Sequence, residues 1–535
     1  MDPEQSKRIG LQVLQVVLGV IIGALVTLSV VRFKEAKHLL NTRYADWRKL
    51  NLVLDMVEKN YVDTLNREGM TDAAITAALS KLDPHSVYLP PQELEASQEE
   101  LAGNFDGIGI QFNVPNDTAI VLEVIPGGPS EKVGLMPGDR LLKVNETVIA
   151  GVKFPQDSMV RRLKGPSGTK VTVTVKREKE TIPFEITRGK IPVHSVDAAF
   201  MLADSIGYLR LSKFSRTTFK ECHEAAIKLQ EQGMKHLIFD VRDNSGGYMD
   251  QALLLSNDFL ARGDTIVYIE GLHRAREVYQ ADGRGDLQDV GLTVLISENS
   301  ASASEIFAGA IQDNDRGRIV GRRSFGKGLV QEPFFFSDNS GVRLTVARYY
   351  TPSGRCIQKP YDGARDYAYD IYYRYAEGEV FSADSVKLDT SDVHRTRAGR
   401  LVYGGGGIMP DVFVPVDTTR ASDFYLACNK KATQMRFASA VFDRYSRRLQ
   451  AIDSFPEMDR FLNEMNLKVE FSFYAKRMDN IHCTEAEWDA SAPYLVPQLK
   501  ALISRYSKLG DNAFYKYYLP VDNTVEDAIS LIKNP

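Results

Sequence analysis

Residues Thr293–Asp313, TVLISENSASASEIFAGAIQD, pass directly from a strand pattern to a helix pattern. TVLIS is a short apolar run, and ASEIFAGAIQD repeats apolar residues at the spacing of a helix. Three serines, Ser300, Ser302 and Ser304, stand at alternate positions of the junction. Ser302 and Glu305 match a capping box, S-x-x-E, which satisfies free N–H groups at a helix start. The stretch predicts a strand-to-helix turn whose hydroxyls have either a structural or a chemical role.

The alternation of strand and helix extends over residues 200–350. IGYLRLSKF and KHLIFDVRD have strand patterns, and the segments that follow them, TTFKECHEAAIKLQEQG and DQALLLSNDFL, have helix patterns. Alternating elements predict an α/β core of packed layers. The fold class expected for the whole chain is therefore α/β, with several domains.

The domain boundaries follow changes in these patterns. Residues 35–99 and 421–535 are expected to be mostly helical, whereas residues 100–190 are short β-runs separated by Gly and Pro turns. The α/β core is expected over 191–420. Its residues 359–403, which are polar and rich in Tyr, are expected to be an insertion.

The N-terminal region contains an uncharged run of 23 residues, Ile9–Val31, which is long enough to cross a bilayer as a helix. No A-x-A-like cleavage site follows it, so a retained signal anchor within residues 1–34 is predicted. Basic residues lie on both sides of the run, and the positive-inside rule leaves the orientation open.

The charge balance excludes one class of partner. The chain has 66 Lys+Arg against 70 Asp+Glu, so no basic excess favours nucleic acid. Its four cysteines lack C-x-x-C spacing and indicate neither a disulfide framework nor a zinc site.

The β-rich region carries two related segments. Gly107-Ile108-Gly109-Ile110 opens a strand, and its glycines let successive backbone N–H groups bind an anion such as a peptide's terminal carboxylate. Residues 127–147, GGPSEKVGLMPGDRLLKVNET, have a turn–helix–turn–strand pattern. Together the segments resemble a PDZ domain, with residues 107–110 as its carboxylate-binding loop.

Two further glycine motifs lie in the α/β region. Residues 240–247, DVRDNSGG, form a strand-to-helix turn where paired glycines permit close approach to a ligand. Residues 321–331, GRRSFGKGLVQ, match most of a phosphate-binding P-loop, but Gly328 replaces its Ser or Thr and a strand pattern follows. An NTPase is therefore a weak alternative. Lys327 and Gln331 are four residues apart, which places both on one face of a strand.

A nucleophilic serine needs a base, and the eight histidines form no local Ser-His-Asp signature. A lysine is a recognised alternative. Among apolar neighbours such as Phe325 and Leu329, Lys327 is expected to be buried, which lowers a lysine pKa from about 10.4 toward roughly 7–8. A neutral lysine accepts the serine proton, and the first N–H groups of the following helix stabilise an oxyanion.

The run SASASE, followed by FGKGLVQ, resembles the signature of the C-terminal processing peptidases, also called tail-specific proteases. LDPHSVYL, the PDZ segment, DVRDNSGG, YYTPSGRCIQ and GGIMPDVFVP occur in that family's order and extend the resemblance over most of the chain. The resemblance implies a ClpP/crotonase-like α/β core with an inserted PDZ domain. Asn299 departs from the family's usual glycine, a change the turn tolerates because Asn adopts left-handed backbone.

The resemblance also implies residue roles. Ser302 is the expected nucleophile, Lys327 its general base and Gln331 the residue that orients the lysine. The expected activity is that of a serine endopeptidase that works through an acyl-enzyme, with no metal or cofactor. Its expected substrates are protein chains recognised near their C-termini through the PDZ domain.

The oxyanion hole implied by the resemblance consists of the backbone N–H of Ala303 and one from Gly246 or Gly247. Ser300 and Ser304 then keep structural roles in the turn and in the first turn of the helix.

The family also implies a single-pass protein of the inner membrane, with its catalytic part in the periplasm. Association with a second copy or an adaptor protein stays open. A catalytically inactive, PDZ-bearing envelope scaffold is the remaining alternative. The presence of Ser302, Lys327 and Gln331 together argues against it.

Overall fold

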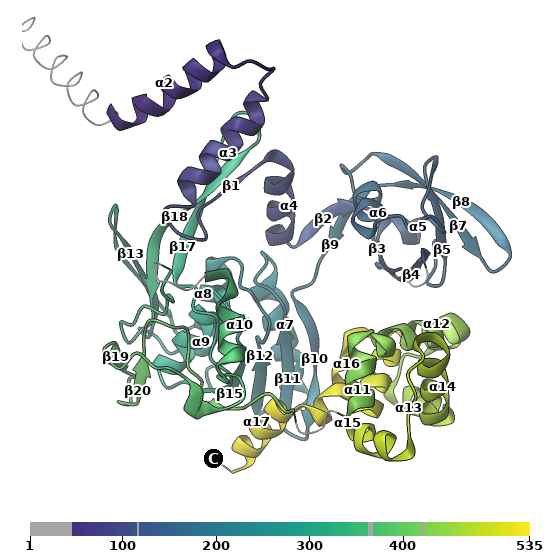
Figure 1. The fold of residues 1–535 in the computed structure, drawn as a ribbon. Coiled ribbons are helices and arrows are strands. Elements are labelled where there is room, and N and C mark those ends of the chain that lie inside the picture. Colours follow the sequence, from purple (N-terminus) through teal and green to yellow (C-terminus); the bar gives the residue numbers. More distant parts are fainter. Residues whose placement is uncertain (1–44, 115–116, 362–366, 419–421, 535) are drawn as a thin grey trace, which may run out of the picture. The chain divides into compact units, whose positions relative to one another are not determined.

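The computed structural model describes residues 45–114, 117–361, 367–418 and 422–534 (Figure 1). Two units are distinguished, Met1–Ala77 and Ala78–Pro535. No helix of the described residues is long and apolar enough to span a membrane. The predicted anchor, Ile9–Val31, lies outside them, so the anchor and the periplasmic location stay predictions.

The N-terminal region is helical, as its pattern predicts, but it also contains a strand. Its helices are α2 (Ala45–Asn60), α3 (Arg67–Leu79) and α4 (Pro91–Ala102). The strand, β1 (Val87–Leu89), comes from the LDPHSVYL motif and pairs with a strand more than two hundred residues later in the chain. Local periodicity cannot reveal so short a strand, because a distant partner stabilises it.

The β-rich module lies between two strands that pair antiparallel, β2 (Asn104–Gly107) and β9 (Gly189–Pro192). Its main sheet has the order β3-β4-β5-β7-β8, with β6 beside β5. Alternate residues of β7 are buried and pack against the apolar side of α6 (Gln156–Leu163). The strands are β3 (Ile110–Asn113), β4 (Ala119–Val124), β5 (Arg140–Val144), β6 (Thr147–Val148), β7 (Lys170–Arg177) and β8 (Glu180–Thr187), and a short helix, α5 (Pro129–Lys132), follows β4.

The α/β core is built on a six-stranded sheet of order β10-β11-β12-β15-β16-β21. All neighbouring pairs except β10 and β11 are parallel. Parallel neighbours require crossover connections, which here contain helices. The strands are β10 (Val196–Ala203), β11 (Ile206–Leu211), β12 (His236–Asp240), β15 (Gly291–Ile296), β16 (Arg318–Gly321) and β21 (Val412–Phe413), and the crossover helices are α7 (Thr218–Glu231), α8 (Met249–Phe259) and α9 (Ala303–Asp313).

Apolar layers cover both faces of this sheet. One face packs against α7, α8 and α9. On the other face, Ile238 and Leu295 of adjacent strands belong to a buried cluster that includes Val525 and Ala528 of α17 (Asn523–Lys533). The last helix therefore belongs to the core, although residues 421–535 were expected to be one separate helical domain.

The preceding C-terminal helices enclose an apolar cluster of their own, which agrees with the helical region expected there. They are α11 (Asp423–Lys430), α12 (Thr433–Ala451), α13 (Phe455–Glu464), α14 (Leu467–Asp479), α15 (Glu485–Ser504) and α16 (Gly510–Tyr518).

A second sheet stands beside the core helices, with the order β1-β18-β13-β14 and with β17 also paired to β18. Its longest hairpin, β17–β18, carries FGKGLVQ at one end and contributes side chains to the cavity described below. The strands are β13 (Thr265–Gly271), β14 (Arg274–Gln280), β17 (Leu329–Phe335) and β18 (Gly341–Tyr350).

The expected insertion, 359–403, contains a helix, α10 (Asp370–Ala376), and a strand pair, β19 (Val393–Arg395) and β20 (Leu401–Tyr403). Arg374 of α10 is buried and donates to the carboxylate of Glu379 over 2.7 Å and to the carbonyls of Arg323 and Ser324. The insertion is thus bonded to the loop that precedes Lys327.

A buried ion pair joins the end of β18 to α9. Arg355 donates to Asp313 Oδ1 and Gln312 Oε1, each over 2.7 Å, and to the carbonyl of Tyr403 over 3.0 Å. Both charged side chains are 0% exposed. Removal of one member leaves a buried charge without its partner, which is far more costly than the loss of an exposed pair.

We expect Arg355→Met to lower the free energy of unfolding by about 3–5 kcal/mol. The matched control is Arg274→Met, which breaks a half-exposed ion pair with Glu332 and should change the free energy of unfolding by at most about 1 kcal/mol. Urea unfolding followed by circular dichroism measures both, and equal losses would contradict the assignment.

Candidate active site

Ser302 stands at the turn between β15 and α9, immediately before the first helical residue. Its backbone has φ 56° and ψ −113°, a left-handed conformation that is unfavourable for a residue other than glycine. The Ser302 N–H donates to Glu305 Oε2 over 2.8 Å, which is the glutamate half of the predicted capping box. Glu305 therefore helps to hold a strained turn.

The two flanking serines bond to the backbone. Ser300 Oγ donates to the carbonyl of Val241 over 2.7 Å, and Ser304 Oγ donates to the carbonyl of Asn244 over 2.9 Å. Both side chains are 0% exposed. Their hydroxyls join the Ser302 turn to the DVRDNSGG turn, and Ser302 is the member of the three that lines a cavity.

The Glu305 carboxylate is fully buried and accepts four hydrogen bonds. Besides Ser302, its donors are the N–H of Lys327 at 2.9 Å, the N–H of Gly326 at 2.7 Å and the hydroxyl of Ser324 at 2.5 Å. Burial raises the pKa of Glu305 to about 7. One carboxylate thus binds the backbone of both Ser302 and Lys327.

Lys327 does not lie on a strand, so the prediction that it shares a strand face with Gln331 is wrong. Residues 323–328 form an irregular loop, and β17 begins only at Leu329. Burial, together with repulsion from the charge of Arg343, lowers the pKa of Lys327 to about 8. Part of the lysine population is therefore neutral near physiological pH.

Gln331 lies on β17 next to a β-bulge and donates its side-chain amide to the backbone carbonyl of His85. It makes no hydrogen bond to Lys327 in the described structure. His85 is a residue that sequence reasoning did not assign; its Nε2 is 2.8 Å from the hydroxyl of Tyr367. Burial and repulsion from Lys327 lower the pKa of His85 to about 4, so its ring is neutral at physiological pH.

Tyr349, another unassigned residue, connects the two central segments. Its hydroxyl bonds to the carbonyl of Lys327 and lies 3.2 Å from the carbonyl of Ser302. The side chain is buried at the end of β18. The quoted motif YYTPSGRCIQ contains this tyrosine, but no local pattern indicates which carbonyl groups it contacts.

Two backbone N–H groups next to Ser302 are candidates for an oxyanion hole. The N–H of Gly246 donates to Asn244 Oδ1 over 2.9 Å, whereas those of Ala303 and Gly247 have no hydrogen-bond partner among the described residues. A Cβ at Gly246 would lie 2.8 Å from that of Ser302, and one at Gly247 would lie 2.0 Å from the carbonyl oxygen of Phe214. Both positions therefore require glycine.

A cavity of about 940 Å³ brings these groups together. Its walls come from the Ser302 turn, the Gly246–Gly247 turn, the β17–β18 hairpin, β1 and α4. The predicted site residues that line it are Ser302, Ala303, Lys327, Gln331, Gly246 and Gly247. Ser302 and Lys327 share this cavity but are not hydrogen bonded to each other in the described structure.

The expected carboxylate-binding loop lies in the β-rich module, between β2 and β3. Gly107 ends β2, Ile110 begins β3, and Gly109 has a φ of 77°. The N–H groups of Ile108 and Gly109 have no hydrogen-bond partner among the described residues. Adjacent unpaired N–H groups are what an anion-binding nest requires.

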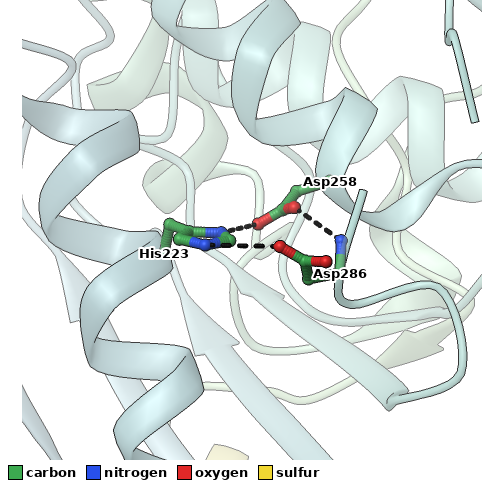
Figure 2. A group of neighbouring side chains, drawn as sticks. All are labelled: His223, Asp258 and Asp286. Carbon is green, nitrogen blue, oxygen red and sulfur yellow. Dashed lines mark hydrogen bonds and ion pairs between the residues drawn. The ribbon is translucent and has the colours of Figure 1, made fainter. Parts of the chain in front are cut away.

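One cluster has the residue types of a metal site (Figure 2). His223 of α7 contacts two carboxylates: Nδ1 is 2.8 Å from Asp258 and Nε2 is 3.5 Å from Asp286. The second oxygen of Asp258 accepts the backbone N–H of Asp286 over 3.0 Å. His223 and the two carboxylates are thus already bonded to one another, and these contacts connect α7, α8 and the loop before β15.

The P-loop alternative fails on geometry. Strand β17 follows the glycine-rich segment that contains Lys327, at the position where a phosphate-binding P-loop has a helix.

Comparison with known proteins agrees with this architecture. The model of peptidase family S41 matches residues 205–366, and a PDZ domain model matches residues 107–187. A protein of Staphylococcus epidermidis (strain ATCC 12228 / FDA PCI 1200) named "Probable CtpA-like serine protease" is 32% identical over 347 residues, which are 64% of this chain and 70% of that protein. The protein of the same name from Staphylococcus aureus (strain MRSA252) is 32% identical over 66% of this chain and 72% of its own length.

Among solved structures, the photosystem II D1 C-terminal processing protease is 28% identical over 67% of this chain and 86% of its own, with a TM-score of 0.36. The identity with the CtpA-like proteins and the share of their length that is matched establish the family. The chain belongs to peptidase family S41 and is a serine-type endopeptidase of the C-terminal processing group that carries a PDZ domain.

Proposed function

We propose that this peptidase cleaves protein chains with a Ser–Lys dyad formed by Ser302 and Lys327. The observation that carries the proposal is the single cavity that both side chains line, next to the unpaired N–H groups of Ala303 and Gly247. A nucleophile, a base of lowered pKa and oxyanion donors are the components that acyl transfer requires.

In the proposed mechanism, neutral Lys327 accepts the proton of Ser302 as the hydroxyl attacks the scissile carbonyl. The negative charge that develops on the carbonyl oxygen is stabilised by the N–H groups of Ala303 and Gly247. Lys327 then returns the proton to the leaving amine, and water hydrolyses the acyl-enzyme. The reaction requires the lysine amine to reach the serine hydroxyl, while Glu305 and Tyr349 hold the two backbones.

Gln331 is proposed to act indirectly. Its amide is bonded to the backbone of His85, whose ring lies close enough to Lys327 for the lysine charge to lower the pKa of His85. This arrangement supports a positioning role for Gln331 in the wall beside the lysine.

Substitution of either dyad residue is expected to abolish proteolysis. Ser302→Ala and Lys327→Ala should each lower kcat by about 10⁴- to 10⁶-fold, and the double variant should be no worse, because the two residues act as one unit. Cleavage of a casein substrate measures this.

The matched control is Ser304→Ala, which removes a neighbouring serine hydroxyl that bonds to the backbone and should retain activity within about tenfold. Cleavage of casein that survives at the wild-type rate in Ser302→Ala would refute the proposed nucleophile.

The pH dependence follows from the base. Only neutral Lys327 accepts a proton, and its pKa is about 8. We therefore expect kcat/KM to fall about tenfold for each pH unit below that value and to level off above it. A peptide substrate assayed across pH in buffers of constant ionic strength measures the profile. A rate that is independent of pH through this range would contradict a lysine base.

The PDZ domain is proposed to bind the C-terminal carboxylate of the substrate. The support is the loop 107–110, where the N–H groups of Ile108 and Gly109 are unpaired. Gly107 at the end of β2 pairs with Gly189 at the start of β9. A short linker between these two residues can therefore replace residues 108–188 and remove the PDZ domain.

With the intact protein, a peptide that ends in a free carboxylate should be cleaved about 10- to 100-fold more efficiently than its C-terminal amide, since charge-assisted hydrogen bonds are lost in the amide. The variant without residues 108–188 should cleave both peptides at similar rates. A preference that persists in that variant would place carboxylate recognition outside the PDZ domain.

A further inference from the structure

The cavity wall has an excess of positive charge. Its basic side chains are Lys213, Arg216, Lys327 and Arg343, and its acidic side chain is Asp250. Asp250 is exposed at the start of α8. The cavity as a whole therefore attracts anionic groups, and a substrate segment that carries a carboxylate is favoured over a neutral one.

Arg343 differs from the other arginines packed around the core. Its side chain is half-buried, and its guanidinium forms neither a hydrogen bond nor an ion pair with a described residue. Its Nε is inaccessible to solvent and unbonded, as is that of Arg355, but Arg355 has a carboxylate partner. By contrast, Arg242, Arg355 and Arg374 each bond to a carboxylate. A partly buried guanidinium without a partner is unfavourable, which indicates a partner outside the chain.

The strand fixes the direction of this side chain. Arg343 lies on β18 opposite Pro333 of β17 and Val87 of β1. Directly opposite residues of two paired strands share a face, so Arg343 lies on the face of Pro333 and, two residues along β17, of Gln331. All three residues line the cavity, so the guanidinium and the catalytic segments face the same space.

Asp83, an acidic group whose charge acts on Lys327 in this wall of the cavity, forms no ion pair with Arg343. Asp83 accepts hydrogen bonds from Ser86, Thr345 and the N–H of His85, and these bonds occupy its carboxylate. The other charged groups around Lys327 are Glu305, whose oxygens are fully bonded, and Arg343 itself. The guanidinium is thus available to an incoming anion.

We propose that Arg343 is a specificity residue that binds a carboxylate of the substrate chain inside the cleft. The carboxylate belongs to an acidic side chain near the scissile bond, because the C-terminal carboxylate of the substrate is assigned to the PDZ domain. This inference rests on the proposed function, since it takes the cavity to be the peptide-binding cleft. A guanidinium binds a carboxylate through two parallel N–H donors, a geometry that a neutral amide does not reproduce.

The first experiment measures binding to the full-length Ser302→Ala protein, so the result does not depend on turnover. A fluorescent peptide series carries one Glu at successive positions, each matched by Gln, and a second pair differs in a free or amidated C-terminus. We expect one position to bind about 10- to 100-fold more tightly as the carboxylate when Arg343 is present. Arg343→Met should remove that preference, and Arg343→Lys should retain part of it.

The two kinds of pair separate the sources of a carboxylate. A Glu effect that depends on Arg343 supports the proposal, whereas an acid–amide effect that depends on Arg343, with no Glu effect, would overturn it. The control is Arg274→Met, which removes the same charge from a half-exposed ion pair outside the cavity and should leave the preference intact.

Kinetics of the active protein separate this role from a merely structural one. Arg343→Met should raise KM for the preferred carboxylate substrate and not for its Gln counterpart. It should also move the acid limb of the pH profile to higher pH, because the loss of a nearby positive charge makes Lys327 easier to protonate. If the limb moves while the carboxylate preference remains, or if Glu and Gln peptides lose binding equally, the proposal is overturned and the dyad mechanism stands.

Discussion

The structure of the active site depends on the buried carboxylate of Glu305. It accepts hydrogen bonds from the N–H groups of Ser302, Gly326 and Lys327. The hydroxyl of Ser324 donates a fourth. A carboxylate without exposure to water is stable only when its lone pairs are bonded. The strained serine turn and the lysine loop, which are more than twenty residues apart, must therefore form together. Tyr349 strengthens the same connection through the two backbone carbonyls.

The charged groups around the cavity set the pKa of Lys327, and one of them, Arg343, also faces the cavity. Burial and Arg343 favour the neutral form of Lys327, whereas Glu305 and Asp83 favour the charged form. The resulting pKa of about 8 lies close to physiological pH, which suits the proposed role of Lys327 as a base. The unpaired guanidinium that contributes to this balance also faces the cavity. A group that adjusts the base can thus also bind the substrate, and these two effects are separable by experiment.

Several features of the fold could be predicted from short patterns. The strand-to-helix turn at Ser302, the alternating core and the β-rich module all follow from apolar periodicity and from Gly and Pro positions. The prediction that Lys327 shares a strand face with Gln331 was wrong. Glycines at 326 and 328 keep the lysine segment irregular, and four-residue spacing places two side chains on one face only within a strand. The hydrogen bond from the Gly246 N–H to the Asn244 side chain could have been predicted from the sequence, because Asn commonly accepts from a backbone N–H two residues later.

The sequence by itself determined the elements and the chemical groups: a serine at a helix start, a lysine in a glycine loop, paired glycines after a strand and a β-rich module with glycines at positions 107 and 109. Tertiary structure alone decided which backbone N–H groups remain unpaired, how far burial lowers the pKa of Lys327, and that Tyr349 and Arg343 face the cleft. These properties depend on desolvation and on contacts between residues distant in the chain, such as β1 with β18. Local periodicity carries no information about such contacts, because it reports only which face of an element is apolar.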